Sequence, residues 1–125
     1  MITKCPQAKI TGAPVVELWV SRTPVQEFMY IDDLADSLVY LLNHYADPTP
    51  INVGMGQGTT IRDLDEIISK VVGYEGTLHW DADRLDGMPK RMLDSSRLTA
   101  LGWQPSVSLE DGLAKTYAWY QDQVA

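Results

Sequence analysis

The side chains best suited to chemistry are a group of cations in the second half of the chain. Lys90 and Arg91 are adjacent, and Arg84 and Arg97 lie nearby in the sequence. Cationic side chains bind phosphate oxygens through charge-assisted hydrogen bonds, which are among the strongest polar contacts in proteins. This cluster predicts a site for an anion such as a pyrophosphate. The alternative, which the sequence leaves open, is a solvated loop whose charges serve solubility.

A glycine-rich stretch from Gly54 to Gly58 is the second candidate site. It follows an expected strand and precedes an expected helix. Asp81 comes later by roughly the interval at which a dinucleotide-binding fold places its ribose-binding acid. The spacing is G-x-G-x-G, however, whereas the cofactor fingerprint is G-x-G-x-x-G. We interpret the stretch as a tight turn with left-handed glycines. A small nucleotide binder that uses this turn is an alternative function.

The other polar residues predict no catalytic group. His44 and His79 have no recognisable nucleophile or carboxylate arrangement around them, and no Cys/His spacing suggests a metal site. Asp32 and Asp33 stand at an expected helix start, where acids usually serve as caps that the helix dipole favours. The single cysteine, Cys5, excludes an internal disulfide.

Short strands and amphipathic helices must position these candidates. Apolar, β-branched stretches predict strands at 15–20, 27–31, 51–53 and 77–80. The first helix should end before Pro48, because proline disrupts a helix. The apolar residues that share one face of this helix are Leu34, Leu38, Leu41, Leu42 and Tyr45.

Three further helices are expected after residue 59. Thr60 should cap the first, with Asp63 at the third position of a weak capping box and Gly73 at the end. A short helix at 96–101 should stop at Gly102, and the last should begin at Ser108. The buried stripe of the first is Ile61, Leu64, Ile67, Ile68 and Val71, and that of the last is Leu109, Leu113, Tyr117 and Tyr120. Strands that alternate with helices in this way indicate an α/β or α+β-like unit.

Composition narrows the function classes. Ten basic and 17 acidic side chains give a net charge of −7, which disfavours nucleic acid as a partner because that binding requires phosphate neutralisation. No apolar run is long enough for a membrane span, and the first residues lack the apolar core of a signal peptide. Together with the free thiol, these features predict a cytoplasmic protein.

The segment from Trp19 to Leu42, WVSRTPVQEFMYIDDLADSLVYLL, resembles the "WGSGTPxREFxHVDDxA" segment of GDP-L-fucose synthases. These are extended short-chain dehydrogenase/reductases, related to NAD-dependent epimerases and dehydratases, that act on a GDP-linked keto-deoxy sugar. The other matching segments follow in the family's order: AKITGAP at 8–14, INVGMG at 51–56, TIRDL at 60–64, VVGYEG at 71–76, DGMPKRMLDSSRL at 86–98, LGW at 101–103 and SLEDGLAKTYAWY at 108–120.

The resemblance implies that this chain corresponds to the C-terminal part of such an enzyme. In the family, the segment like Trp19–Leu42 lies in the second half of a much longer chain. The implied fold is the C-terminal substrate domain of an extended reductase with a remnant of its Rossmann sheet, to which the INVG strand belongs. We expect residues 1–13 to be a partly flexible lead-in and residues 14–125 to form a nucleotide-sugar substrate-binding-like domain.

The resemblance also implies substrate-binding residues. Trp19 matches a family tryptophan near the substrate, although a strand-end core anchor is the alternative. Gln26 stands where the family has an arginine that contacts phosphate or sugar. Asp86 and either Lys90 or Arg91 match residues that contact the GDP-sugar. Because glutamine carries no charge, we expect weak binding of a GDP-sugar.

Catalysis in this superfamily uses a tyrosine four residues before a lysine and a glycine-rich NADP-binding fingerprint. This sequence contains six tyrosines, and none has a lysine four positions later. The fingerprint is absent as well. We therefore expect no catalytic residues, no bound cofactor and no activity from this chain alone, although the full-length family implies NADP. A self-associating module without a small-molecule ligand is the alternative function, and we expect a homo-oligomer, most simply a homodimer.

Overall fold

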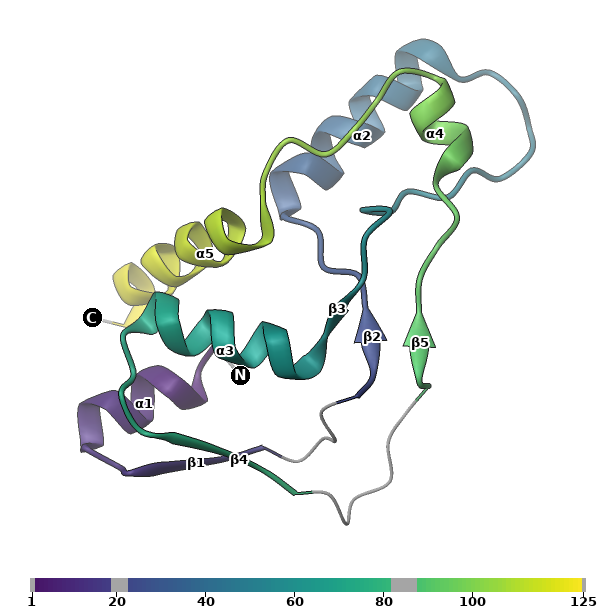
Figure 1. The fold of residues 1–125 in the computed structure, drawn as a ribbon. Coiled ribbons are helices and arrows are strands. Elements are labelled where there is room, and N and C mark those ends of the chain that lie inside the picture. Colours follow the sequence, from purple (N-terminus) through teal and green to yellow (C-terminus); the bar gives the residue numbers. More distant parts are fainter. Residues whose placement is uncertain (1, 19–22, 82–87, 125) are drawn as a thin grey trace.

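The computed structural model describes residues 2–18, 23–81 and 88–124 (Figure 1). They form a mixed structure with helices and two small sheets. The helices are α1 (Lys4–Thr11), α2 (Ile31–His44), α3 (Ile61–Val72), α4 (Ser96–Ala100) and α5 (Leu109–Val124). The strands are β1 (Val15–Leu18), β2 (Val25–Gln26), β3 (Thr59–Thr60), β4 (Thr77–Trp80) and β5 (Lys90–Arg91).

The hydrophobic core lies between α1, α3 and the parallel pair of β1 and β4. Helix α5 runs beside α3 in Figure 1, and Leu109, Leu113 and Tyr117 of α5 pack against the core as expected. The buried residues of the core are Cys5, Ala8, Val16, Leu18, Leu64, Ile68, Val72 and Tyr74.

A second sheet connects this core to α2 and α4. Its strand order is β3-β2-β5, with β2 antiparallel to β3 and parallel to β5. Each strand is only two residues long, so the sheet contributes little buried area and serves mainly to set which residues of the three segments lie opposite one another. It brings residues 25–26, 59–60 and 90–91 together from three distant parts of the sequence.

The expected helix ends are confirmed where they depend on neighbouring residues. The Thr60 hydroxyl accepts a hydrogen bond from the backbone N–H of Asp63 at 3.1 Å, and the Ser108 hydroxyl accepts one from Asp111 at 3.1 Å. Gly73 ends α3 with a φ of 68°. These ends are determined within about one helical turn, which explains why the sequence predicts them.

Three expectations of local structure were wrong. Residues 4–11 form α1, whose Cys5 and Ala8 are buried, although no helix was expected in this part of the sequence. The strand expected at 27–31 is replaced by β2, which ends at Gln26, and by α2, which begins at Ile31. Ile51–Val53 form no strand among the described residues, because no other strand lies beside them.

The expected apolar face of α2 is divided. Leu34 and Leu41 are half-buried, but Leu38 and Leu42 are 53% and 84% exposed. The buried residues of this helix are instead Asp33 and Ser37. The periodicity predicts the helix correctly, but it does not determine which side of the helix packs against the rest of the molecule.

Among the described residues, no helix is both long and apolar enough to cross a membrane.

Candidate functional site

The pairing of β2 with β5 brings together three of the predicted site residues. Gln26 stands opposite Arg91, and Val25 stands opposite Lys90. The backbone N–H of Val25 also donates to the carbonyl of Pro89 at 2.9 Å, which continues the pairing. Paired residues on adjacent strands point to the same face of a sheet, so the Gln26 amide and the Arg91 guanidinium share one face. The predicted contacts Trp19 and Asp86 lie outside the described residues.

A cavity of about 620 Å³ lies next to this strand pair. Lys90 and Arg91 both contribute to its lining, and both residues are exposed to solvent. Four of the five methionines of the chain also line it, namely Met29, Met55, Met88 and Met92. Unbranched thioether side chains adapt to irregular partners. The cavity therefore combines a cationic edge with a deformable apolar wall, and we refer to it as the methionine cavity.

Glu27, which the sequence analysis missed, holds one end of this cavity together. Its two carboxylate oxygens accept hydrogen bonds from the backbone N–H groups of Gly56 at 2.9 Å and Leu93 at 3.0 Å. These bonds join the end of β2 to the glycine turn and to the chain that leaves β5. The sequence gives no signal for this role, because an acidic residue after a strand is ordinarily solvated.

The 54–58 turn has a structural role in this arrangement. Gly56 has a φ of 69°, and its N–H is already bonded to Glu27. A Cβ on Gly58 would collide with Val25 and lie 2.8 Å from the Met92 sulfur, so close packing requires glycine there. Because the Gly56 N–H is bonded to Glu27, it is not available to donate to a phosphate. These contacts favour the tight-turn interpretation over the nucleotide-binding alternative.

Arg97 does not join the cationic cluster. Its guanidinium donates to the carbonyl of Pro50 at 3.1 Å and to the Tyr45 hydroxyl at 2.8 Å. It therefore fastens α4 to the loop that follows α2, which is a structural role. Arg84 lies outside the described residues. Of the four cations considered from the sequence, Lys90 and Arg91 are the ones placed at the cavity.

The prediction that Asp32 or Asp33 caps α2 was wrong. Tyr30 occupies the cap position, and both acids lie within the first turn, where the helix dipole still favours them. Asp33 is buried and accepts bonds from the Ser106 N–H at 3.1 Å, the Ser106 hydroxyl at 2.9 Å and the Val107 N–H at 2.9 Å. Burial raises the pKa of Asp33, but the hydrogen bonds from Val107 and Ser106 outweigh that effect and hold the pKa below its usual value.

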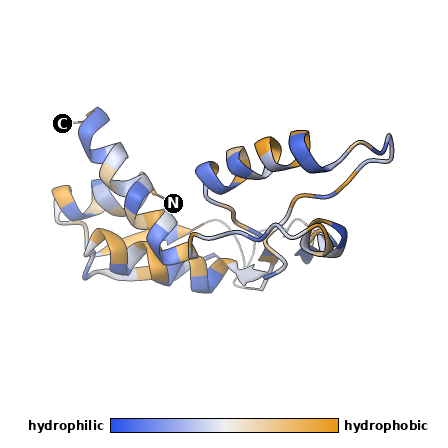
Figure 2. Cartoon of the chain, turned by 90° about the horizontal axis from the view of Figure 1, so that it is seen from above, coloured by the Kyte–Doolittle hydropathy of each residue, from blue (hydrophilic) through white to orange (hydrophobic). Residues whose placement is uncertain are grey.

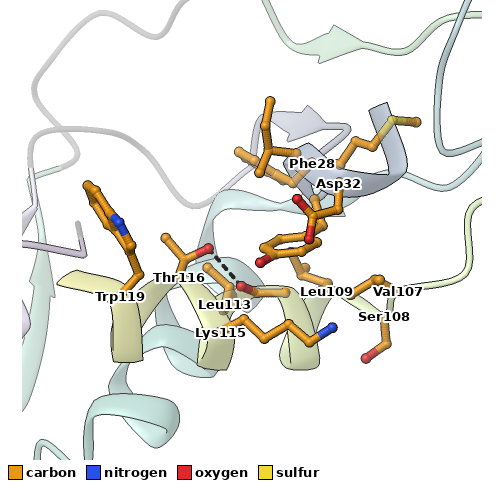
Figure 3. Close-up of a pocket in the computed structure, with 13 residues that line it drawn as sticks. Phe28, Asp32, Val107, Ser108, Leu109, Leu113, Lys115, Thr116 and Trp119 are labelled. Atoms are coloured by element: carbon orange, nitrogen blue, oxygen red, sulfur yellow. Dashed lines mark hydrogen bonds between the residues drawn. The ribbon is translucent and has the colours of Figure 1, made fainter. Parts of the chain in front are cut away.

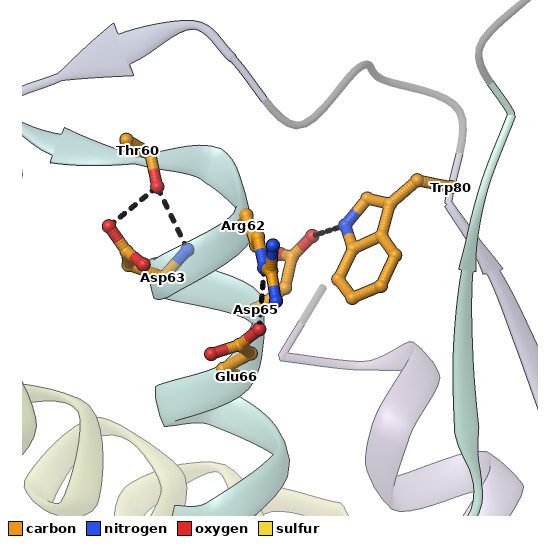
Figure 4. A network of polar contacts seen from close by, with 6 residues as sticks. All are labelled: Thr60, Arg62, Asp63, Asp65, Glu66 and Trp80. Atoms are coloured by element: carbon orange, nitrogen blue, oxygen red, sulfur yellow. Dashed lines mark hydrogen bonds and ion pairs between the residues drawn. The ribbon is translucent and has the colours of Figure 1, made fainter.

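A buried carboxyl in the core is a further feature that the sequence analysis missed. Asp65 of α3 is fully buried, and its Oδ2 accepts a hydrogen bond from Trp80 Nε1 at 2.9 Å (Figure 4). Its Oδ1 has no hydrogen-bond partner within the described residues. Burial raises the pKa of Asp65 to about 6, although the Trp80 bond opposes the shift. A burial effect also raises the pKa of the Cys5 thiol, with a smaller contribution from Asp65.

The histidines contribute no site. His44 is exposed, stacks on the Tyr40 ring at 4.0 Å and contacts the Tyr40 carbonyl through Nδ1 at 2.8 Å. His79 lies on β4, away from the methionine cavity. Over the part of the chain that the structure describes, no group of three or more potential ligands is arranged for a metal ion.

A second cavity of about 620 Å³ lies between the start of α2 and α5 (Figure 3). In this view Leu109 and Leu113 of α5 lie below Phe28 and Asp32, and Trp119 stands apart from them farther along α5. The Lys115 ammonium lies 5.3 Å from the centre of the Tyr30 ring, within reach of a cation–π contact. The lining is mainly apolar, and among the described residues Lys115 is the one cation that contributes to it. The methionine cavity is therefore the better candidate for an anionic ligand.

No protein-family model matches the chain. Comparison with curated proteins finds GDP-L-fucose synthase 1 of Arabidopsis thaliana, which is 48% identical over 118 residues, and GDP-L-fucose synthase of Sinorhizobium fredii, which is 41% identical over 125 residues. The alignments cover 94% and 100% of this chain but only 36% and 40% of those relatives. The chain thus spans well under half the length of the curated relatives that it matches.

Solved structures agree with the fold. A GDP-mannoheptose C4 reductase from Campylobacter jejuni is similar with a TM-score of 0.83 at 28% identity. The superposition covers 96% of this chain and 43% of the reductase chain. A GDP-L-fucose synthetase from Naegleria fowleri bound to NADP is similar with a TM-score of 0.91 at 20% identity. This superposition covers 98% of this chain and 39% of the synthetase chain.

The fold and these matches place the chain in the extended short-chain dehydrogenase/reductase class. Within that class, it corresponds to the C-terminal part of a GDP-L-fucose synthase. The sequence-based recognition of the family and of the fold class is therefore confirmed.

Proposed function

We propose that this chain forms the nucleotide-sugar-binding part of a GDP-L-fucose synthase-like enzyme and holds the diphosphate of a GDP-sugar beside β2 and β5. The supporting observation is the register of these strands, which sets Gln26 opposite Arg91 and Val25 opposite Lys90. The methionine cavity offers an apolar wall next to these cations. A charged edge beside an apolar wall suits a ligand with a diphosphate and a flat base.

The proposed binding is weak. Gln26 supplies a hydrogen bond but no charge, and both cations are exposed to water, which reduces their electrostatic attraction for a phosphate. We also propose Trp19 and Asp86 as substrate contacts, on the strength of the family resemblance. We propose that residues 14–125 form the substrate-binding-like domain, and that α1 packs against the core of this domain through Cys5 and Ala8.

Thermal shift with GDP, GDP-mannose and NADP tests this function, because a ligand that binds only the folded state raises its melting temperature. The expected result is a small shift with GDP and GDP-mannose and none with NADP. Arg91→Ala and Lys90→Ala should abolish the shift. Arg62→Ala is the matched control, because it removes an exposed cation on α3, where Arg62 pairs with Glu66 at 2.8 Å.

The result with each ligand separates the alternatives. An NADP-specific shift would support the 54–58 nucleotide-binding alternative instead. A GDP shift that survives loss of both cations would overturn the assignment of the site. No shift with any ligand would favour an interaction module without a small-molecule ligand.

We further propose that this chain alone is catalytically inactive. The observation is that no tyrosine in the sequence has a lysine four positions later, so the proton-transfer pair of the superfamily is missing. The test is NADPH oxidation in the presence of GDP-4-keto-6-deoxymannose, compared with a heat-denatured sample. Turnover above that background would refute the proposal.

A self-associating module is the second candidate function. The exposed apolar residues of α2 favour it, because large exposed apolar surfaces mark interaction sites. Light scattering at micromolar concentration tests it. A stable monomer of about 14 kDa, the mass of one chain, would exclude a homo-oligomer under those conditions.

A further inference from the structure

The three strands of the second sheet meet at one apolar junction. A Cβ added to Gly58 would collide with a methyl group of Val25 and would lie 2.8 Å from the Met92 sulfur, so both side chains pack directly against Gly58. Val25 belongs to β2, Gly58 immediately precedes β3, and Met92 immediately follows β5. Figure 1 and Figure 2 both show this sheet between the core helices and the end of the molecule that carries α2 and α4. We call Val25, Gly58 and Met92 the sheet junction.

Three backbone hydrogen-bond donors around the sheet junction are already engaged. The N–H groups of Gly56 and Leu93 donate to the Glu27 carboxylate at 2.9 and 3.0 Å. The Val25 N–H donates to the Pro89 carbonyl at 2.9 Å. A polar atom introduced at the junction would have to compete with these acceptors or turn outward to water, because burying a polar group without a hydrogen bond is unfavourable.

Met92 is also accessible to small oxidants in solution. Met92 is 36% exposed and Met88 is 61% exposed, whereas Met29 and Met55 are half-buried. The rate at which a thioether is oxidised follows its exposure. Met88 and Met92 should therefore react first among the four methionines that line the methionine cavity. Of these two, Met92 is the one that packs at the sheet junction.

Oxidation converts the apolar methionine side chain into a polar sulfoxide. The sulfur lone pair attacks one oxygen of a hydroperoxide such as hydrogen peroxide, so that an S–O bond forms and the O–O bond breaks. Sulfur loses two electrons, and the second peroxide oxygen takes up the proton of the first and leaves as water. A methionine sulfoxide reductase reverses the step with two thiols, which become a disulfide, and the oxygen is released as water.

We propose that Met92 is a reversible oxidation site and that its sulfoxide opens the sheet junction. The new oxygen draws the side chain away from Gly58 toward water, which removes the packing that holds β5 against β2 and β3. Lys90 and Arg91, the two residues of β5, are then held less firmly beside β2. Met88 is an oxidisable neighbour without this effect, because it lies outside the sheet junction.

Treatment with hydrogen peroxide followed by hydrogen exchange tests the proposal. Peptide mass spectrometry assigns the added oxygen to individual methionines. We expect exchange of the Val25 amide, which bonds to Pro89, to accelerate by about tenfold or more once Met92 is oxidised, because the junction then opens locally. The Thr77 amide, which bonds to the Pro14 carbonyl at 2.9 Å in the core, should keep its rate. Methionine sulfoxide reductase with dithiothreitol should restore slow exchange at Val25.

Three variants separate the two exposed methionines. Met92→Leu conserves the volume of the side chain and cannot form a sulfoxide, so peroxide should leave the Val25 amide slow. Met88→Leu is the matched control and should respond to peroxide as the original protein does. Met92→Gln places a polar group at the junction without an oxidant and should reproduce the fast exchange. Met1, which lies outside the described residues, is common to all variants, so its oxidation does not affect the comparison.

Three outcomes would overturn the proposal. The first is unchanged exchange at Val25 in protein that is fully oxidised at Met92. The second is equal acceleration in Met92→Leu and the original protein. The third is a Met92 that stays reduced while Met29 or Met55 reacts. None of these measurements contains a nucleotide, so a failure of this proposal is distinguishable from a failure of GDP-sugar binding.

Discussion

At the scale of single residues, the candidate site has a neutral side chain where a cation would bind a phosphate best. Gln26 lies opposite Arg91 in the strand pair and opposite Thr59 on its other side. It is half-buried, and the next residue, Glu27, is engaged by two backbone N–H groups. A longer, charged side chain at position 26 can therefore act on the ligand without disturbing the contacts that shape the cavity.

We predict that Gln26→Arg tightens GDP binding. A charged hydrogen bond to phosphate contributes on the order of 1.5–3 kcal/mol, which corresponds to roughly ten- to a hundredfold in affinity. Calorimetric titration of GDP into both proteins measures the difference. Gln26→Met is the control, because it keeps the length of the side chain and adds no charge. If Gln26→Arg and the original protein bind GDP with equal affinity, position 26 does not contact the phosphates.

Asp65 supports a prediction about pH. Its pKa is raised to about 6 in the folded protein, above the ordinary value of 3.8. The folded state therefore binds the proton more tightly, so this group adds stability as the pH falls from about 7 to about 4. Asp65→Asn keeps an acceptor for Trp80 and cannot ionise. It should be more stable than the original protein at pH 8, by on the order of 1–3 kcal/mol, and should lose that advantage near pH 4.

Urea denaturation across this pH range measures the effect. Glu66→Gln is the matched control, because it removes an exposed acid one residue away on the same helix. A stability difference between Asp65→Asn and the original protein that stays constant from pH 4 to pH 8 would contradict a raised pKa for Asp65.

At the scale of elements, α2 is attached mainly by polar contacts from its buried side. We predict that Asp33→Ala loosens this attachment, because it leaves the Ser106 and Val107 donors without their acceptor. The expected loss is about 1–3 kcal/mol in unfolding free energy. Asp32→Ala, at the exposed neighbouring position, should cost far less. Hydrogen exchange of the α2 amides should accelerate in Asp33→Ala and not in Asp32→Ala.

The sequence predicts those features of the elements that are determined locally. Thr60, Gly73 and Ser108 mark helix ends through contacts within a turn, and each was predicted correctly. The burial of α2 was not predictable, because the same periodicity is compatible with either side facing the core. Ile51–Val53 shows the same limit, since a strand requires a neighbour that this chain does not supply among its described residues.

The candidate site was also predictable only in part, because some of its contacts join residues that are far apart in the sequence. The family resemblance gives Gln26, Lys90 and Arg91, and the β2–β5 register brings them together. The role of Glu27 depends on backbone groups 29 and 66 positions away in the sequence, which no local pattern signals.

At the scale of the whole molecule, the core and the candidate site lie in different regions. The core elements α1, α3 and β1 occupy one end of Figure 1, and α2 and α4 occupy the other. The short sheet of β3, β2 and β5 joins them. The buried apolar residues Leu98 and Trp103 lie in the region of α2 and α4 and are not part of the main core cluster, so we expect this region to unfold locally more readily than the core.

The last prediction concerns the chain in isolation. Its exposed apolar residues on α2, namely Ile31, Leu38, Val39 and Leu42, should lead two copies to associate weakly, because pairing two helices along this side removes apolar surface from water. The net charge of −7 opposes non-specific aggregation, so a discrete dimer is expected. Sedimentation over a range of concentrations should show a monomer–dimer equilibrium that Leu42→Lys shifts to monomer and Ile10→Lys leaves unchanged. A dimer equally stable in both variants would place the contact elsewhere on the molecule.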